Sequence, residues 1–334
     1  MSTRRPWLLT AGCVLIAANL RPGITSAGPL LDEIRDATGM SAIVAGLLTT
    51  LPLLAFGLVS PLAPVVGRRV GIERTLLVAM GVLGLGLLVR STGPTAVVLG
   101  GTAVIGTAMA FGNVLLPAVI KQDFPGRAGV MMAVYSTTLA GTAGIAAGVT
   151  VPLADGAGLG WRGALAVWAA LAAVAVVVWA PQARRTSGMV ARGDGAPARV
   201  VPRLRGSTLA WSVTAFMGLQ SLVFYSLVTW LPTLLRDHGM SASTAGWMLA
   251  LMQIVSLVST VIVPVAAMRR GEQRALVAVS ALTLLAGLIG LDALGTGAAV
   301  LWVSLLGLGS GALFSLALTF LILRAADAPH AAAL

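Results

Sequence analysis

The sequence has few of the residues that disulfides, metal sites and catalytic sites require. Cys13 is the only cysteine among 334 residues, so the chain forms no intrachain disulfide. His238 and His330 are the only histidines, and no metal-ligand cluster, nucleophile–histidine arrangement or phosphate-binding loop occurs. We therefore expect no metal, no cofactor and no enzymatic activity.

Charged residues are also scarce. They make up 10% of the chain, against about 25% in soluble domains, while 57% of the residues are hydrophobic and the mean hydropathy is +0.95. This balance excludes an ordinary soluble domain and predicts an all-α integral membrane protein that crosses the lipid bilayer several times.

Ten apolar segments are long enough to cross a bilayer, which takes about 20 helical residues. They lie at roughly 7–32, 41–64, 75–91, 95–120, 128–154, 161–180, 207–235, 241–267, 275–292 and 297–323. One long connection, 181–206, is basic, rich in glycine and proline, and lacks apolar periodicity. We expect an N-terminal six-helix bundle (1–180), a cytoplasmic linker (181–206) and a C-terminal bundle of helices seven to ten (207–334).

The basic residues are distributed unevenly between the connections. The net charge is +11, and 17 of the 22 lysines and arginines fall in alternate connections, which include the N-terminus and the linker. Four fall in the other set: Arg35, Arg90, Arg162 and Arg236. The positive-inside rule then predicts a cytoplasmic-membrane protein with a cytoplasmic N-terminus. We interpret the excess of basic residues as a result of membrane orientation and of contact with anionic lipid headgroups. We therefore expect no nucleic-acid partner.

Carboxylates are missing from the middle of every predicted span. Asp32, Glu33 and Asp292 lie at outer ends of spans, and the other acidic residues lie in connections. A buried-carboxylate proton relay is therefore not predicted. Facilitated diffusion and proton coupling through Asp32 or Glu33 both remain open.

Arg21 is the one charge in the middle of an apolar span. A cation there costs about 3 kcal/mol or more on insertion scales, so such residues usually face a cavity and serve a function. The next residue, Pro22, lacks the N–H that would bond Ala18, and Gly23 adds further freedom to the backbone. A weakened helix beside a lone cation is how transporters build anion sites.

A few polar residues in other spans complete a predicted site. Thr25 shares a helical face with Arg21, whereas Asn19 lies about 200° away and equally fits a role in linking helices. Pro117 frees the carbonyl of Asn113 from its helical bond. The predicted substrate-binding residues are Arg21, Thr25, Asn113, Gln220, Tyr225 and Asn19; Tyr135 and Gln253 are left open.

The two halves of the chain repeat with an offset of 200 residues. Gly39-Met40-Ser41-Ala42 recurs as Gly239-Met240-Ser241-Ala242, and Pro64-Val65 recurs as Pro264-Val265. Six spans separate the copies, so both cross the membrane in the same direction, as in transporters built from parallel six-helix repeats. Two full repeats need about 400 residues and twelve spans, so we expect a truncated chain that lacks helices eleven and twelve. The tail Arg324–His330 then corresponds to the loop that leads into them.

Four motifs resemble the cyanate/2-nitroimidazole transporter family of the major facilitator superfamily. They are Asn19-Leu20-Arg21-Pro22; Gly46-Leu47-Leu48-Thr49-Thr50-Leu51-Pro52; Gly112-Asn113-Val114-Leu115-Leu116-Pro117 with Lys121; and Gly218-Leu219-Gln220-Ser221 followed by Tyr225 and Trp230-Leu231-Pro232. The resemblance covers the whole chain. It implies secondary transport of small solutes by alternating access, and a gating loop that contains Arg69, Gly71 and Arg74. The superfamily's loop usually also carries an aspartate, which is absent here.

The sequence thus predicts a permease of the inner membrane for a small anion such as cyanate or for a polar planar compound. A multidrug or aromatic-compound exporter of the same superfamily is one alternative. A truncated membrane protein that does not transport is another. A membrane enzyme is a weaker one, because the sequence shows no catalytic arrangement.

Overall fold

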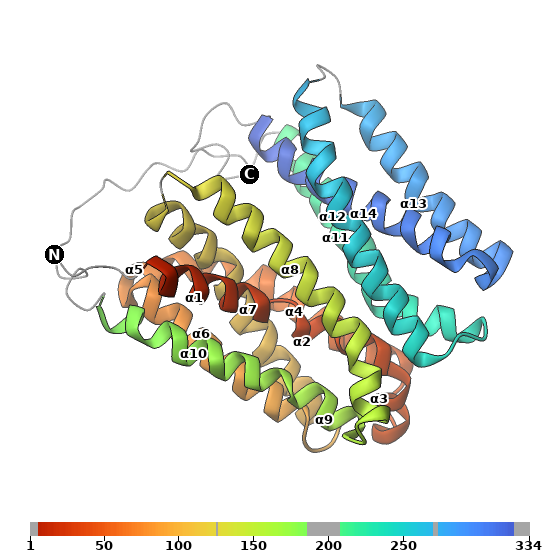
Figure 1. Cartoon of the computed structure of the whole chain (residues 1–334), viewed down its shortest axis with the longest axis horizontal. Coiled ribbons are helices and arrows are strands. Elements are labelled where there is room, and N and C mark those ends of the chain that lie inside the picture. The colour runs from red at the N-terminus through yellow and green to blue at the C-terminus, as the bar shows by residue number, and fades with distance from the viewer. Residues whose placement is uncertain (1–5, 125, 186–207, 270–272, 324–334) are drawn as a thin grey trace. The chain divides into compact units, whose positions relative to one another are not determined.

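The computed structural model describes residues 6–124, 126–185, 208–269 and 273–323, and within these ranges every regular element is a helix (Figure 1). Contacts divide the chain into two compact units. The first unit comprises Met1–Gly193 with Ser241–Trp247, and the second comprises Asp194–Met240 with Met248–Leu334.

The first half of the chain contains the helices α1 to α10. Their bounds are α1 Pro6–Asn19, α2 Pro22–Thr25, η1 Gly28–Leu30, α3 Leu31–Thr38, α4 Ala42–Val59, η2 Ser60–Leu62, α5 Ala63–Val70, α6 Ile72–Arg90, α7 Thr95–Asp123, α8 Ala128–Val151, η3 Pro152–Gly156, α9 Gly160–Ala166 and α10 Trp168–Arg185. The second half contains α11 Thr208–Asp237, α12 Ala242–Arg269, α13 Arg274–Leu294, η6 Gly295–Ala298 and α14 Ala299–Leu323.

The described helices account for all ten predicted spans. Nine stretches within the described ranges are helical for most of their length, apolar and long enough to cross a membrane. The last of them, Arg274–Ala317, contains both α13 and the first part of α14, which the short turn η6 separates and which pack along each other (Figure 1). That stretch therefore supplies two spans, at the positions predicted for helices nine and ten.

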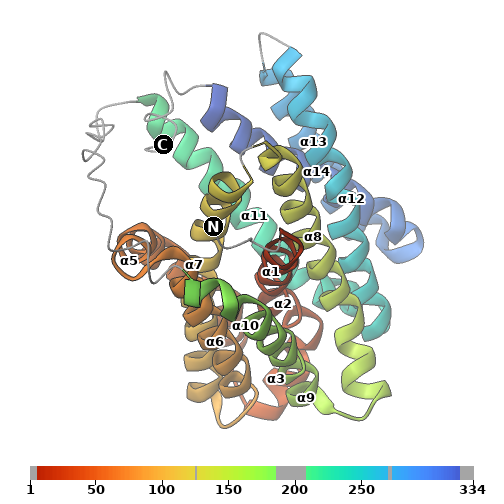
Figure 2. The ribbon, with the colours of Figure 1, turned by 60° about the vertical axis from the view of Figure 1, so that its left-hand side comes forward.

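Small residues allow the helices of the first unit to approach closely. The helix α6 packs against both α7 and α10, and α1 lies between α8 and α10 (Figure 2). A Cβ atom on Gly106 of α7 would lie 2.5 Å from the Cα atom of Pro52 of α4. Trp179 of α10 is fully buried, and its indole N–H donates to the Glu73 carbonyl at the start of α6 at 2.9 Å. Close approach of this kind is how helices associate in lipid, where burial of apolar surface gives little drive.

Glycines also allow close helix packing around α14 in the second unit. A Cβ atom on Gly287 of α13 would lie 2.8 Å from the Trp302 carbonyl oxygen, and one on Gly307 of α14 would lie 2.6 Å from the Met252 carbonyl oxygen of α12. Large apolar side chains are instead exposed on the outer faces, as at Val78 of α6 (61%) and Val261 of α12 (70%). Apolar outer faces and small residues at the helix contacts are the arrangement that a lipid environment favours.

The 200-residue repeat also appears in the backbone. Gly39 ends α3 with a φ angle of 68°, and Gly239 occupies the matching position after α11 with a φ angle of 88°. Two residues further on, Ser41 Oγ accepts a hydrogen bond from the Val44 amide at 3.4 Å, and Ser241 Oγ accepts one from the Thr244 amide at 3.2 Å. Each copy therefore ends one helix on a left-handed glycine and starts the next on a serine cap.

The segment predicted as a gating loop is largely helical. Arg69 lies in α5, and Arg74 lies in the first turn of α6; both side chains are exposed. Gly71 alone joins the two helices, and its φ angle of 99° lets the chain reverse within one residue.

The predicted linker also begins later than expected. The helix α10 continues through Pro181 to Arg185, so residues 181–185 are helical. The rest of the predicted linker and the tail Arg324–His330 lie outside the described residues.

We predict that Gly39→Ala and Gly239→Ala each lower the free energy of unfolding by about 1 kcal/mol, because a side chain strains the left-handed backbone. Nothing lies within 4 Å of a Cβ atom at either position, so crowding makes no contribution. Thermal unfolding of the detergent-purified protein measures the effect. Gly81→Ala is the matched control, since Gly81 lies inside α6 with equally open space and should gain stability from alanine. Unfolding of both variants at the wild-type temperature would contradict the prediction.

Candidate functional site

The first span is broken where the sequence predicts a weakened helix. The helix α1 ends at Asn19 and α2 begins at Pro22, after which the chain continues through η1 into α3. The Leu20 amide donates to Ala17, only three residues back, at 3.1 Å. Proline at the first position of α2 has no N–H with which to continue the helical pattern. The break therefore follows from the local sequence and lies in the middle of the apolar stretch Trp7–Thr38.

Arg21 occupies the break itself. Its backbone is non-helical, with a φ angle of −125°, and its side chain is half-buried. Its carbonyl oxygen accepts hydrogen bonds from the amides of Ile24 at 2.9 Å and Thr25 at 3.1 Å, and from the Thr25 hydroxyl at 3.2 Å. Arg21 and buried Thr25 are therefore coupled through one short turn, and the cation sits where the backbone is least regular.

Asn19 faces a neighbouring helix. Its Nδ2 atom donates to the carbonyl of Leu15 at 2.8 Å and to that of Leu171 in α10 at 3.2 Å, and the residue is only 3% exposed. Both amide hydrogens are thus bonded to backbone carbonyls, and the one on Leu171 ties α1 to α10. This geometry favours the helix-linking role that the sequence left open.

Asn113 pairs with a residue that the sequence left undecided. Its Nδ2 atom donates to the Met109 carbonyl at 2.9 Å, and its Oδ1 atom accepts from the Tyr135 hydroxyl of α8 at 3.2 Å. Asn113 and Tyr135 are both half-buried. The pair connects α7 with α8 one turn before Pro117, at the point where α7 lacks one helical hydrogen bond.

The remaining predicted residues lie on α11 in the second unit. Gln220 is 7% exposed, and its Nε2 atom donates to Ser221 Oγ at 2.9 Å. Tyr225 is half-buried and meets the ring of Phe224 edge to face, with ring centroids 5.2 Å apart. Upstream of the repeated glycine motif the offset becomes 201, since Arg35-Asp36 recurs as Arg236-Asp237. At that offset Pro22 matches Val223, and α11 is continuous there.

A pocket of about 450 Å³ lies within the second unit and contains none of the predicted site residues. Its wall is mostly apolar and comprises Ser212, Val213, Phe216, Gln273, Arg274, Val277, Ala278 and Phe320. Among the described residues, no three His, Cys, Asp or Glu side chains lie close enough together to hold a metal ion.

Sequence reasoning misplaced one functional candidate, Arg90. It was assigned to an outer connection, but the structure makes it the last residue of α6, only 1% exposed, with Nη1 donating to the Gly23 carbonyl in α2. The turn residues that follow Arg90 resemble a solvent-exposed loop. The contact spans 67 positions in the sequence, and no local pattern reveals it.

Comparison with known proteins places this fold. The family model described as Major Facilitator Superfamily matches residues 10–334. The chain belongs to the major facilitator superfamily. Within this superfamily, the chain is 46% identical over 331 residues to the uncharacterized transporter YycB of Bacillus subtilis, covering 98% of this chain and 81% of the relative.

Two other relatives carry names that agree with the family suggested by the motifs. The 2-nitroimidazole transporter of Escherichia coli is 41% identical over 334 residues, covering 100% of this chain and 84% of that protein. The cyanate transport protein CynX of Escherichia coli is 33% identical over 306 residues, covering 91% and 78%. The predicted membership in the cyanate/2-nitroimidazole transporter type is thereby confirmed.

Solved structures show the same fold at low sequence identity. The D-xylose–proton symporter superposes with a TM-score of 0.75 at 14% identity, covering 99% of this chain and 85% of that one. A bacterial homologue of the human lysosomal transporter Spinster gives 0.74 at 16% identity, covering 96% and 75%. The protein is a multi-pass membrane protein of the major facilitator superfamily and a secondary transporter of a small solute.

We predict that Asn19→Leu lowers the free energy of unfolding by about 1 kcal/mol, because it removes the link between α1 and α10, and leaves ligand affinity unchanged. Thermal unfolding with and without ligand separates the two effects. Asn113→Leu serves as the comparison, since the predicted site makes it lose affinity. If Asn19→Leu lost affinity at unchanged stability, Asn19 would belong to the binding site.

Proposed function

We propose that this transporter carries a small anion, or a planar solute with an electronegative end, across the cytoplasmic membrane by alternating access. The observation that carries the proposal is Arg21, a half-buried cation at the break of the first span. Among the matched relatives, two are named for cyanate and 2-nitroimidazole, and these solutes fit that description.

Electrostatics favours an anionic or electronegative solute at Arg21. A guanidinium in the low-dielectric middle of a membrane attracts negative charge more strongly than it would in water. The planar guanidinium also presents N–H groups in a fork that suits a flat, oxygen-bearing or nitrogen-bearing group. A bulky organic cation would be repelled by the same residue.

Hydrogen-bonding groups complete the proposed recognition. In the first unit, Thr25 and the Asn113–Tyr135 pair supply hydroxyl and amide groups that can hold a polar solute. In the second unit, Gln220 and Tyr225 on α11 stay binding residues predicted from the sequence. Each is at least half-buried, so a hydrogen bond to the solute would form away from bulk water. Asn19 contributes least, because its amide hydrogens already bond to the carbonyls of Leu15 and Leu171.

Orientation and coupling belong to the same proposal. The distribution of basic residues between the connections supports a cytoplasmic N-terminus. If transport is coupled to protons, Asp32 and Glu33 are the carboxylates that would carry them. Asp32 Oδ1 lies 3.4 Å from Arg35 Nη1, and Glu33 Oε1 accepts a hydrogen bond from the Trp161 amide at 3.3 Å. Protonation of either carboxylate would therefore weaken an existing contact. The exporter alternative is not favoured by the matched relatives, and we propose no catalytic role.

We predict that Arg21→Gln strongly weakens ligand-induced stabilisation, because the variant keeps hydrogen-bonding capacity but loses the charge. The expected loss of affinity is roughly tenfold to a hundredfold, the usual contribution of a charged hydrogen bond. A thermal-shift panel on the detergent-purified protein measures it, with sodium cyanate, other small monovalent anions, 2-nitroimidazole and cationic drugs as ligands.

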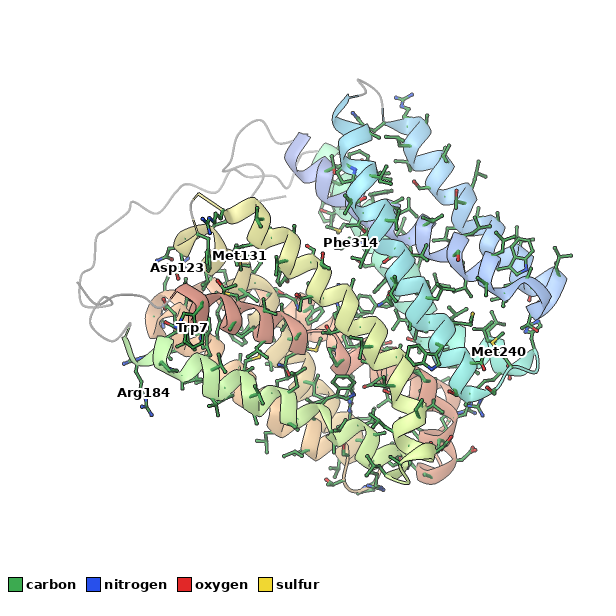
Figure 3. The ribbon with its side chains drawn as sticks, viewed as in Figure 1. Trp7, Asp123, Met131, Arg184, Met240 and Phe314 are labelled. Carbon is green, nitrogen blue, oxygen red and sulfur yellow. The ribbon has the colours of Figure 1, made fainter. Side chains whose placement is uncertain are left out.

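Arg184→Gln is the matched control for this experiment. Arg184 has the same charge but lies exposed near the end of α10, where Figure 3 shows its side chain extending away from the helix bundle. Stabilisation by cyanate or nitroimidazole in wild type and Arg184→Gln, but not in Arg21→Gln, supports the proposal. Equal stabilisation in all three proteins contradicts it, and stabilisation by cationic drugs alone supports the exporter.

A further inference from the structure

Arg90 is a buried cation that the proposed binding site does not use. Its side chain is 1% exposed, and its Nη1 atom donates to the Gly23 carbonyl. Its Nε and Nη2 atoms are buried and have no hydrogen-bond partner among the described residues. Within the described part of the chain, the single hydrogen bond of this guanidinium goes to the broken turn of the first span.

The Gly23 carbonyl is available because the helix is broken. In a continuous helix the Ala27 amide would donate to Gly23, but here it donates to the Ile24 carbonyl at 3.2 Å. A carbonyl without a partner in a membrane interior is costly, and a side chain commonly satisfies it. Arg90 provides a charge-assisted bond in the place of the missing backbone one.

Close packing fixes the direction from which Arg90 reaches the turn. A Cβ atom on Gly101 of α7 would overlap the backbone of Arg90, so α6 and α7 touch at that residue. A Cβ atom on Gly23 would lie 3.0 Å from Ile105 Cγ2 of α7. The helices α2, α6 and α7 therefore meet around the guanidinium, which leaves little room for the turn to rotate.

Fold stability alone does not account for a cation at this position. Taking a guanidinium out of water costs several kcal/mol, and a single hydrogen bond recovers only part of that. Replacing a poorly paired buried charge with an apolar side chain of similar size is often neutral or stabilising. The buried position of Arg90 is better explained by its hydrogen bond to the Gly23 carbonyl, which restrains the turn Pro22–Thr25.

We propose that Arg90 is a positioning residue that holds the turn Pro22–Thr25, and through it Arg21, in the orientation that binds solute. The turn has only four residues, and the Arg21 carbonyl accepts the amides of Ile24 and Thr25 across it. Rotation of the Gly23 peptide would therefore displace the backbone of Arg21. This inference rests on the function proposed above for Arg21.

The test compares Arg90→Met, Arg90→Lys and Arg21→Gln in the full chain, with sodium cyanate and 2-nitroimidazole as probes. We expect Arg90→Met to unfold at the wild-type temperature or higher without ligand, while its affinity for the probe falls about tenfold. Arg90→Lys keeps a cationic donor for the Gly23 carbonyl and should recover affinity to within a few-fold of wild type.

A double variant provides a readout that a purely structural residue would not move. If Arg90 acts through Arg21, then Arg21→Gln combined with Arg90→Met should bind no more weakly than Arg21→Gln alone. Arg162→Met is the matched control. The Arg162 guanidinium also donates to carbonyls of the first unit, those of Ser91 at 3.3 Å and Gly93 at 3.2 Å, but not to the turn, so affinity should persist.

Each outcome decides between defined alternatives. Wild-type affinity in Arg90→Met, or failure of that variant to fold, overturns the inference and makes Arg90 a structural residue. Loss of affinity in Arg21→Gln with none in Arg90→Met rejects only this inference. Wild-type affinity in Arg21→Gln, or no response of the wild-type protein to either probe, instead rejects the proposed function on which the inference depends.

Discussion

A guanidinium in the middle of an apolar span is the constraint on which the rest of the first unit depends. The charge of Arg21 needs a polar setting, and the break at Pro22 provides one by freeing backbone groups. The freed groups then need partners of their own, and Thr25 and Arg90 serve them. Glycines at the helix contacts bring α6 and α7 close enough for Arg90 to reach the turn. The embedded charge, the irregular backbone, the second buried cation and the close helix packing thus occur together around one turn.

Features that depend on local chemistry were readable from the sequence. The lengths of the apolar segments predict the membrane spans. Pro22 predicts the break in the first span, because a proline has no N–H to donate whatever its surroundings. The repeated glycine–methionine–serine motif gave matching helix ends, since only glycine adopts a left-handed backbone without strain. Membership in the transporter family followed from several such motifs taken together.

Features that depend on distant contacts were not readable. Nothing near Asn113 indicates that its amide oxygen accepts from Tyr135, 22 residues away. Arg90 lies beside turn-forming residues and was therefore assigned to an outer connection, although tertiary packing buries it. The connection at Gly71 is shorter than a charge-rich segment suggests, because a single glycine suffices to reverse the chain. Hydrophobicity patterns report the lipid-facing surface well and the polar interior poorly.

The unbroken α11 has a mechanical consequence that sets it apart from its counterpart in the first unit. Up to the internal Pro232 it is a rod roughly 36 Å long, at 1.5 Å of rise per residue. Tilting such a rod by about 5° about one end displaces the other by roughly 3 Å, so a movement at Thr208 is passed on to Leu231. The first span has no such continuous rod, because its helix is interrupted at Arg21 and the turn that follows is held by Arg90. One copy of the repeat can thus pass a tilt along its length, whereas the other fixes a turn at its middle.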